Sequence, residues 1–273
     1  VGDGKMRNIW RLGAVLFTIG VLSACSNKNE SSESTQASNE ISLKSAENDA
    51  KTVLSYIYDG KVNGVEKVTG QTADENDDFL LSKLAEKQND QFEANGNEDD
   101  YYLIIDGSEY FAENIVADYA NAYLEKTKEI GYDSDIKVEE LNKDEVTIAA
   151  TITPIAGLSE ANPIGNARTE LFGGLDEEEF IHKSQNKDVK TIQSLITLKL
   201  YAMYYGDMAN SPEKSPETKE VSFTMEKEGN HYTVDEGVLY QLAKDSRDQN
   251  YADSTSTTES TDTLDSDMVD DSL

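Results

Sequence analysis

The chain contains a single cysteine, Cys25, at a border between two different kinds of sequence. Residues 16–31 read LFTIGVLSACSNKNES, an apolar run followed by polar residues without an apolar pattern. A cysteine thiolate is nucleophilic enough to accept a lipid group. One cysteine allows no disulfide within the chain, so we expect the folded part to be stabilised by packing.

The segment before Cys25 has the composition of a signal peptide. Arg7 and Arg11 give it a positive start, and an apolar stretch follows from Leu12. That stretch runs for about thirteen residues, whereas a helix that spans a bilayer needs about 20. The sequence therefore predicts a signal peptide over residues 1–24. A secretory signal with a chance cysteine and a short membrane anchor are the alternatives.

The four residues that end this segment resemble the bacterial lipobox, which is Leu-small-small-Cys. Here they are Leu22, Ser23, Ala24 and Cys25. In lipoproteins of that class the cysteine sulfur receives a diacylglyceryl group, palmitate being a common acyl chain, and cleavage makes the cysteine the new N-terminus. The resemblance implies lipidation of Cys25 and attachment to the extracytoplasmic face of the cell membrane. Two acyl chains suffice for stable anchoring.

The other residues that could carry chemistry give weak patterns. The sequence has no phosphate-binding loop, dinucleotide fingerprint, nucleophile elbow or HExxH motif. Its two histidines, His182 and His231, are too few for a histidine-rich zinc site, and we expect each to be an ordinary surface or edge residue. We therefore predict no catalytic residue, no metal site and no cofactor.

Two other sequence patterns could form a binding site, one for calcium and one for a glycan or peptide. Asn95–Asp100 with Asp106 has oxygen ligands at calcium-loop spacing, but it lacks the glycine at position 6 and the glutamate at position 12. The tyrosine pairs could line a groove for glycan or peptide; more simply, each pair puts one ring in the core and one on the surface. These pairs are Tyr56 and Tyr58, Tyr101 and Tyr102, and Tyr204 and Tyr205.

The charge balance narrows the choice of partners. The chain has 24 Lys and Arg against 54 Asp and Glu, a formal net charge of -30. Such a chain is repelled by nucleic acid and by anionic lipid, because both are bound through clustered basic residues. We expect membrane attachment through the lipid on Cys25, a protein or cell-wall partner, and no nucleic acid.

Periodicity indicates helices over residues 45–59, 77–92 and 108–130, a fourth that starts at Leu175 and breaks near Asn186, and the most apolar helix from Val189. Asp176 and Glu179 have the spacing of a capping box at the start of the fourth helix. Alternating residues predict two hairpins, 136–152 and 221–234. Residues 154–174 look irregular, and we expect a partner surface there.

This order predicts an α+β fold, in which helices pack on one face of a four-stranded antiparallel sheet made of two hairpins. By analogy alone, the order also suggests cystatin-like or NTF2-like folds. We expect a disordered tether over 25–44, a single domain over 45–245 and a disordered, acidic Ser/Thr-rich tail over 246–273.

Most of the domain resembles a family of lipoprotein domains of unknown function from Gram-positive bacteria. The resemblance lies in AENDAKTVLSYIY at the start, KVEELNKDEVTIAATI in the centre and KEVSFTMEKEGNHYTVDEGVLYQL at the end. The segment ANPIGNARTELFGG departs from the pattern, because such domains more often carry uninterrupted helix there. The resemblance implies location and fold, and no catalytic residue.

Three functions fit these observations. The first is a lipid-anchored cell-surface domain that binds or interacts with a partner. The second is a solute-binding lipoprotein of a transporter, although such proteins usually have two lobes with alternating strands and helices. The third is a cell-wall hydrolase that uses paired carboxylates, whose facing pairs the sequence cannot identify.

Overall fold

The computed structural model describes residues 32–92, 94, 101–157, 162–184, 188–206 and 214–247. The chain divides into two compact units, residues 1–38 and 39–273, and nearly all described residues belong to the second. The predicted signal peptide, lipobox and Cys25 lie outside the described residues. So do Asn95–Asp100.

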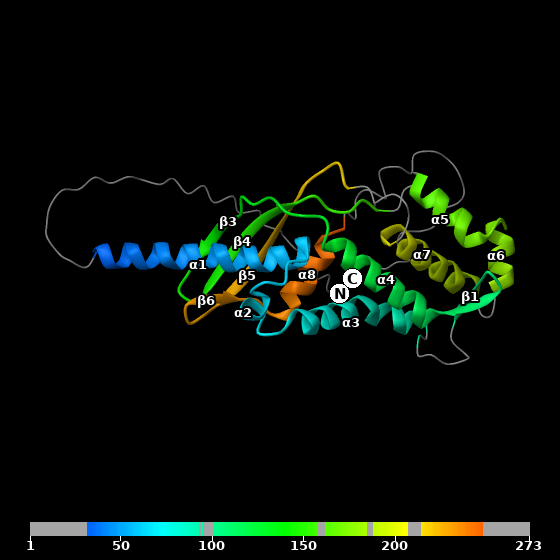
Figure 1. Ribbon diagram of the computed structural model, residues 1–273, viewed down its shortest axis with the longest axis horizontal. Helices are drawn as coiled ribbons and strands as arrows, with labels where there is room; N and C mark the ends of the chain where they lie inside the picture. The colour runs from blue at the N-terminus through cyan, green and yellow to red at the C-terminus, as the bar shows by residue number, and fades with distance from the viewer. Residues whose placement is uncertain are drawn as a thin grey trace, which may run out of the picture. The chain divides into compact units, whose positions relative to one another are not determined.

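The described part alternates groups of helices with pairs of strands (Figure 1). In chain order the elements are α1 (Ser32–Asp59), α2 (Val65–Thr69), α3 (Ala73–Gln91), β1 (Tyr102–Ile105), β2 (Ser108–Phe111), α4 (Ala112–Thr127), β3 (Lys137–Leu141), β4 (Glu145–Ile152), α5 (Asn162–Phe172), α6 (Glu177–Ser184), α7 (Val189–Tyr205), β5 (Lys219–Glu228), β6 (His231–Thr233) and α8 (Glu236–Asp245).

The main sheet has the order β3-β4-β5-β6, and every neighbouring pair is antiparallel. Ile148 pairs with Phe223 and Val146 with Met225, so the apolar residues of β4 and β5 share one face. These side chains are buried, whereas Ser222 and Thr224 on the other face are exposed. The predicted α+β fold, with helices on one face of a sheet made of two hairpins, is therefore confirmed.

Helices α4 and α7 form the centre of a helical layer, in which α3 packs on α4 and α5 packs on α7 (Figure 1). Tyr119 and Tyr123 of α4 face Tyr201 and Tyr205 of α7, and the ring centroids lie 5.3–6.4 Å apart. The same apolar core continues to the sheet. Edge-on aromatic contacts of this kind add to the stabilisation from burial.

Several predicted element ends are confirmed. The carboxylate of Asp176 accepts a 2.7 Å hydrogen bond from the backbone N–H of Glu179, so Asp176 caps the helix as its spacing indicates. The helix predicted over 108–130 ends three residues early, at Thr127, so Gly131 does not end it; Gly131 has a positive φ of 73°, and its N–H donates to the carbonyl of Tyr58. Gly229 has a φ of 60° in the turn between β5 and β6. Glycine adopts this left-handed conformation without a steric penalty.

Two predictions about the middle of the chain are wrong. The segment 108–111 is a strand, and the helix starts only at Ala112, because Asp106 and Gly107 turn the chain in a two-residue hairpin with φ values of 52° and 80°. Residues 162–172 of the predicted irregular stretch form α5. Its buried Ile164, Ala167 and Leu171 recur at helical spacing, which gives the helix an apolar stripe.

The predicted limits of the domain also differ from the structure. Helix α1 begins at Ser32, inside the predicted tether, and the hydroxyl of Ser42 lies 2.7 Å from that of Tyr232. At the other end, Ser246 and Arg247 of the predicted tail are buried. Arg247 donates a hydrogen bond to the Tyr201 hydroxyl and lies over its ring. These contacts order residues that composition alone assigns to flexible segments.

Candidate functional site

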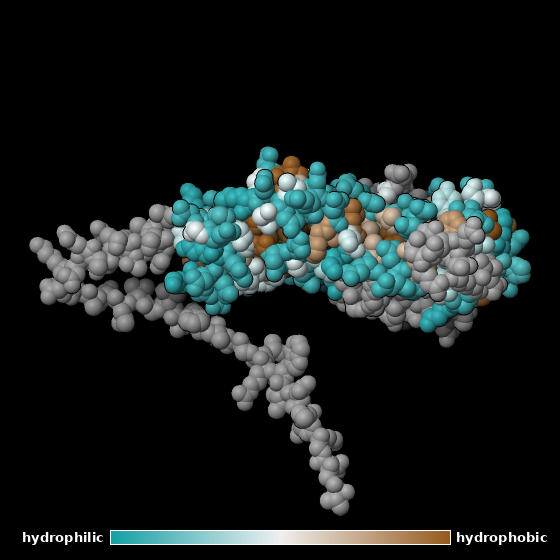
Figure 2. Space-filling model, turned by 90° about the horizontal axis from the view of Figure 1, so that it is seen from below, coloured by the Kyte–Doolittle hydropathy of each residue, from teal (hydrophilic) through white to brown (hydrophobic). Residues whose placement is uncertain are grey.

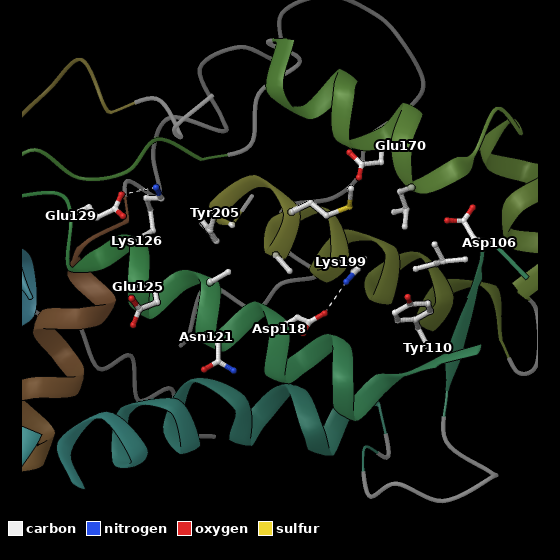
Figure 3. Close-up of a pocket in the computed structure, with 16 residues that line it drawn as sticks. Asp106, Tyr110, Asp118, Asn121, Glu125, Lys126, Glu129, Glu170, Lys199 and Tyr205 are labelled. Carbon is white, nitrogen blue, oxygen red and sulfur yellow. Dashed lines mark hydrogen bonds and ion pairs between the residues drawn. The ribbon is translucent and has the colours of Figure 1, made fainter. Parts of the chain in front are cut away.

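A groove with a volume of about 750 Å³ lies where α4, α5, α7 and the β1–β2 turn meet (Figure 3). We call it the acidic groove. Its lining residues are Ile105, Asp106, Tyr110, Asp118, Asn121, Ala122, Glu125, Lys126, Glu129, Glu170, Leu171, Lys199, Ala202, Met203, Tyr205 and Gly206.

The helices place the groove residues at regular intervals. Asp118, Ala122 and Glu125 of α4 are separated by one helical turn each, and on α7 Ala202 and Met203 both lie about one turn after Lys199. Each helix therefore contributes a mixed stripe of small apolar and charged side chains. Leu171 of α5 and Ile105 of β1 add branched apolar surface.

Charged side chains of the groove form two ion pairs, drawn as dashed lines in Figure 3. The Lys199 ammonium lies 2.8 Å from the Asp118 carboxylate, and it also lies 5.5 Å from the ring centroid of Tyr110. The Lys126 ammonium lies 2.7 Å from the Glu129 carboxylate. Because both lysines are held by carboxylates, neither contributes uncompensated positive charge to the groove.

The remaining acidic residues of the groove leave it negative. Glu125 lies 3.3 Å from Lys128, which is itself bound to Asp77. Asp106 and Glu170 are exposed, and neither has an ion pair or side-chain hydrogen bond within the described ranges. They come from different elements, the β1–β2 turn and α5 (Figure 3). The groove therefore presents unpaired negative charge from more than one side.

One buried polar atom beside the groove has no partner. Tyr205 lines the groove and is 1% exposed, and its hydroxyl makes no hydrogen bond in the described structure. Burial raises the pKa of Tyr205 well above its ordinary value, since the ionised form loses its hydration there. A buried hydroxyl without a partner is costly and is rare in folded proteins.

The neighbouring tyrosine hydroxyls are bonded, in contrast. Tyr123 donates to the carbonyl of Ala243 at 2.8 Å and accepts from Ser246 at 2.8 Å. Tyr58 donates to the carbonyl of Leu242. These bonds satisfy carbonyls in the last turn of α8, which have no partner within the helix. Two tyrosines thus join the end of α8 to α1 and α4.

The structure separates the residues that the sequence singled out. Asp106, taken from a candidate calcium loop, lies in the acidic groove. His182 lies on the outer surface of α6, and His231 lies at the hairpin turn with Nε2 3.9 Å from Glu228. The predicted surface positions of these two histidines agree with the structure. Among the described residues, no three His, Cys, Asp or Glu side chains are placed to hold a metal ion.

The expectation that each tyrosine pair splits between core and surface is wrong for two of the three pairs. Tyr56 and Tyr58 are both buried, as are Tyr204 and Tyr205, because α1 and α7 contact neighbours on more than one side. The Tyr56 hydroxyl donates to Asp77 of α3 at 2.6 Å. Tyr102 is partly exposed beside buried Tyr101, so these tyrosines do not form an aromatic groove.

Sequence reasoning missed the groove as a site. Its lining residues come from segments that are far apart in the chain, and their spacing reveals only which face of each helix they share. One signal was available, since Asp106-Gly107 between apolar residues is a common hairpin-turn dipeptide. It would have placed Asp106 at an exposed turn.

One face of the described residues is largely hydrophilic. Figure 2 shows one face, on which apolar residues reach the surface in small separate areas. In the ranges that the structure describes, no helix has the length and apolarity to cross a membrane.

Comparison with known proteins gives one distant match. No protein-family model matches the chain, and no curated protein matches it. Among solved structures it is similar to ycdA of Bacillus subtilis subsp. subtilis str. 168, provisionally described as a lipoprotein. The two chains are 15% identical, with a TM-score of 0.44, over 80% of this chain and 60% of that one. The chain thus spans less than two thirds of that neighbour, and at this similarity we infer neither its function nor its family from the match.

Proposed function

We propose that this protein is a lipid-anchored, extracytoplasmic binding protein of the bacterial cell surface. The observation that carries the proposal is the sequence Leu22-Ser23-Ala24-Cys25 directly after a positively charged and then apolar segment. Small residues before the cysteine let a peptidase bind the backbone closely, and the thiolate accepts the lipid. The membrane then holds the protein through acyl chains rather than through charge.

The folded part supports a binding role. It offers a groove of about 750 Å³ with an apolar floor and charged rims, which is the usual composition of a ligand site. The described strands all pair antiparallel, in a four-stranded sheet and a two-stranded sheet. This differs from the alternating strands and helices that we expect of a two-lobed solute-binding protein.

Metabolic labelling with palmitate in the native host tests the anchor. We expect label in the wild-type chain and recovery of that chain in the membrane fraction. The Cys25→Ala variant loses the acceptor sulfur, so it should carry no label. The matched control is Ser23→Ala, which keeps a small residue before the cut and should be labelled like the wild type.

Two results would count against the anchor. One is an unlabelled wild-type chain under conditions in which other lipoproteins of the host are labelled. The other is equal labelling of the wild type and the Cys25→Ala variant, which would place any lipid on a different residue.

A further inference from the structure

We propose that the acidic groove binds an extended, lysine- or arginine-rich segment of a partner protein. This proposal rests on the proposed binding function and names the chemical class of its ligand. Three features of the groove point to such a segment: its length, its unpaired charge and its apolar floor.

The length of the groove suits a peptide better than a small cation. Its lining residues on α4 run from Asp118 to Lys126, which is about 12 Å along the helix axis at the rise of an α-helix. About four residues of extended chain span that distance. A single ammonium group or metal ion would contact one carboxylate and leave most of the groove unfilled.

The charges of the groove favour a positively charged ligand. Five carboxylates and two lysines line it, and both lysines are bound to carboxylates of the same groove. Asp106 and Glu170 keep their full negative charge for a ligand. A basic segment would pair with them, whereas the chain's own tail over 248–273, with its eight acidic residues and no Lys or Arg, would be repelled.

The floor of the groove suits the aliphatic stems of lysine and arginine. Ile105, Leu171 and Met203 line it together with two alanines. Long basic side chains bury their methylene groups against such surface while the charged head reaches a carboxylate. Methionine adapts to differently shaped partners, so the floor tolerates more than one basic sequence.

The test is fluorescence anisotropy of a labelled eight-residue peptide of alternating Lys and Leu, titrated at low salt with the full chain in detergent. We expect saturable one-to-one binding. A peptide of alternating Glu and Leu should not bind. The decisive variant is Asp106→Asn with Glu170→Gln, which removes the two unpaired carboxylates, and asparagine tolerates the left-handed φ of 52° at position 106.

The matched control is Glu145→Gln with Glu226→Gln. These two exposed residues pair across β4 and β5, away from the groove, and their replacement changes the net charge equally. The groove variant should weaken binding about tenfold, the effect of two exposed charge pairs, and the control should change it less than about twofold. Circular dichroism confirms that both variants are folded.

Two outcomes would overturn the proposal: no saturable binding of the basic peptide, or equal loss in the groove variant and the control. The second would show diffuse attraction to the whole acidic surface. Neither outcome depends on lipidation of Cys25, so a failure here is distinct from a failure of the anchor.

Discussion

At the scale of single residues, two neighbouring tyrosines show how the same group can have opposite effects. The hydroxyl of Tyr123 bonds to Ala243 and Ser246, and it joins α4 to the end of α8. The hydroxyl of Tyr205 is equally buried and bonds to nothing in the described residues. A buried hydroxyl with partners stabilises the fold, whereas one without partners costs about 1–3 kcal/mol.

We predict opposite signs for the same substitution at these two positions. Tyr123→Phe should lower the free energy of unfolding by about 1–2 kcal/mol, because it removes the buried hydrogen bonds that the hydroxyl makes with Ala243 and Ser246. Tyr205→Phe should leave the free energy unchanged or raise it by about 1 kcal/mol. Urea denaturation of the full chain at pH 7.5, followed by circular dichroism, measures both. Equal losses in the two variants would contradict this account of Tyr205.

Alkaline pH gives a second measurement on Tyr123→Phe. Burial raises the pKa of Tyr123 to about 12, against an ordinary value of 10.0. The unfolded chain therefore loses this proton first, so the stabilisation is complete below about pH 10 and is lost as the pH rises toward 12. Between these pH values the stability of Tyr123→Phe should fall less steeply than that of the wild type. Equal slopes of stability against pH for the variant and the wild type would contradict this, because they would show that Tyr123 ionises as easily in the folded chain as in the unfolded chain.

At the scale of the elements, Asp49 joins three of them. It lies on α1 and is 4% exposed; it accepts the backbone N–H of Tyr232 on β6 at 2.9 Å and the ammonium of Lys67 on α2 at 2.6 Å. A buried carboxylate needs such donors, because burial removes its hydrogen bonds to water. The carboxylate thereby fixes where α1 meets the edge of the sheet.

We predict that Asp49→Ala lowers the free energy of unfolding by about 2–3 kcal/mol. The substitution leaves the buried N–H of Tyr232 without its acceptor and removes the charged hydrogen bond from Lys67. Asp59→Ala is the matched control on the same helix. Asp59 pairs with Lys61, whose side chain is 67% exposed, so its loss should cost less than about 1 kcal/mol. Urea denaturation compares the two. An effect of Asp49→Ala as small as that of the control would contradict a joining role.

The sequence predicted those elements whose signals are local. The hairpin turn at Gly229, the cap at Asp176 and the start of α7 depend on residues within a few positions of one another. Helix α5 was missed because proline and glycine in ANPIGNARTELFGG read as a loop, although Ile164, Ala167 and Leu171 form a buried stripe. Burial of that stripe against α7 is a tertiary effect that local propensity does not contain.

The groove could not be predicted for the same reason. Asp106 and Glu170 meet only because the β1–β2 hairpin and α5 both pack near α7, and no spacing in the chain encodes that meeting. The helical structure of residues 32–44, at the start of α1, was missed for a similar reason. Ser42 and its neighbours are polar in composition, yet the bonds of Ser42 to Tyr232 and Lys227 connect them to the domain.

At the scale of the whole molecule, charge and lipid have separate roles. A formal net charge of -30 repels anionic lipid, so electrostatic attraction does not favour attachment to a membrane. The same charge attracts basic partners, and the acidic groove gives that attraction a defined place. The proposed function thus assigns location to a lipid on Cys25, and the proposed peptide site assigns recognition to the folded domain.

The most direct test of this account is the mass of the N-terminal peptide of the protein purified from its native host. The account predicts that the peptide begins at Cys25 and carries a diacylglyceryl group on the sulfur. A peptide that retains the leader, or that begins with an unmodified cysteine, would contradict it.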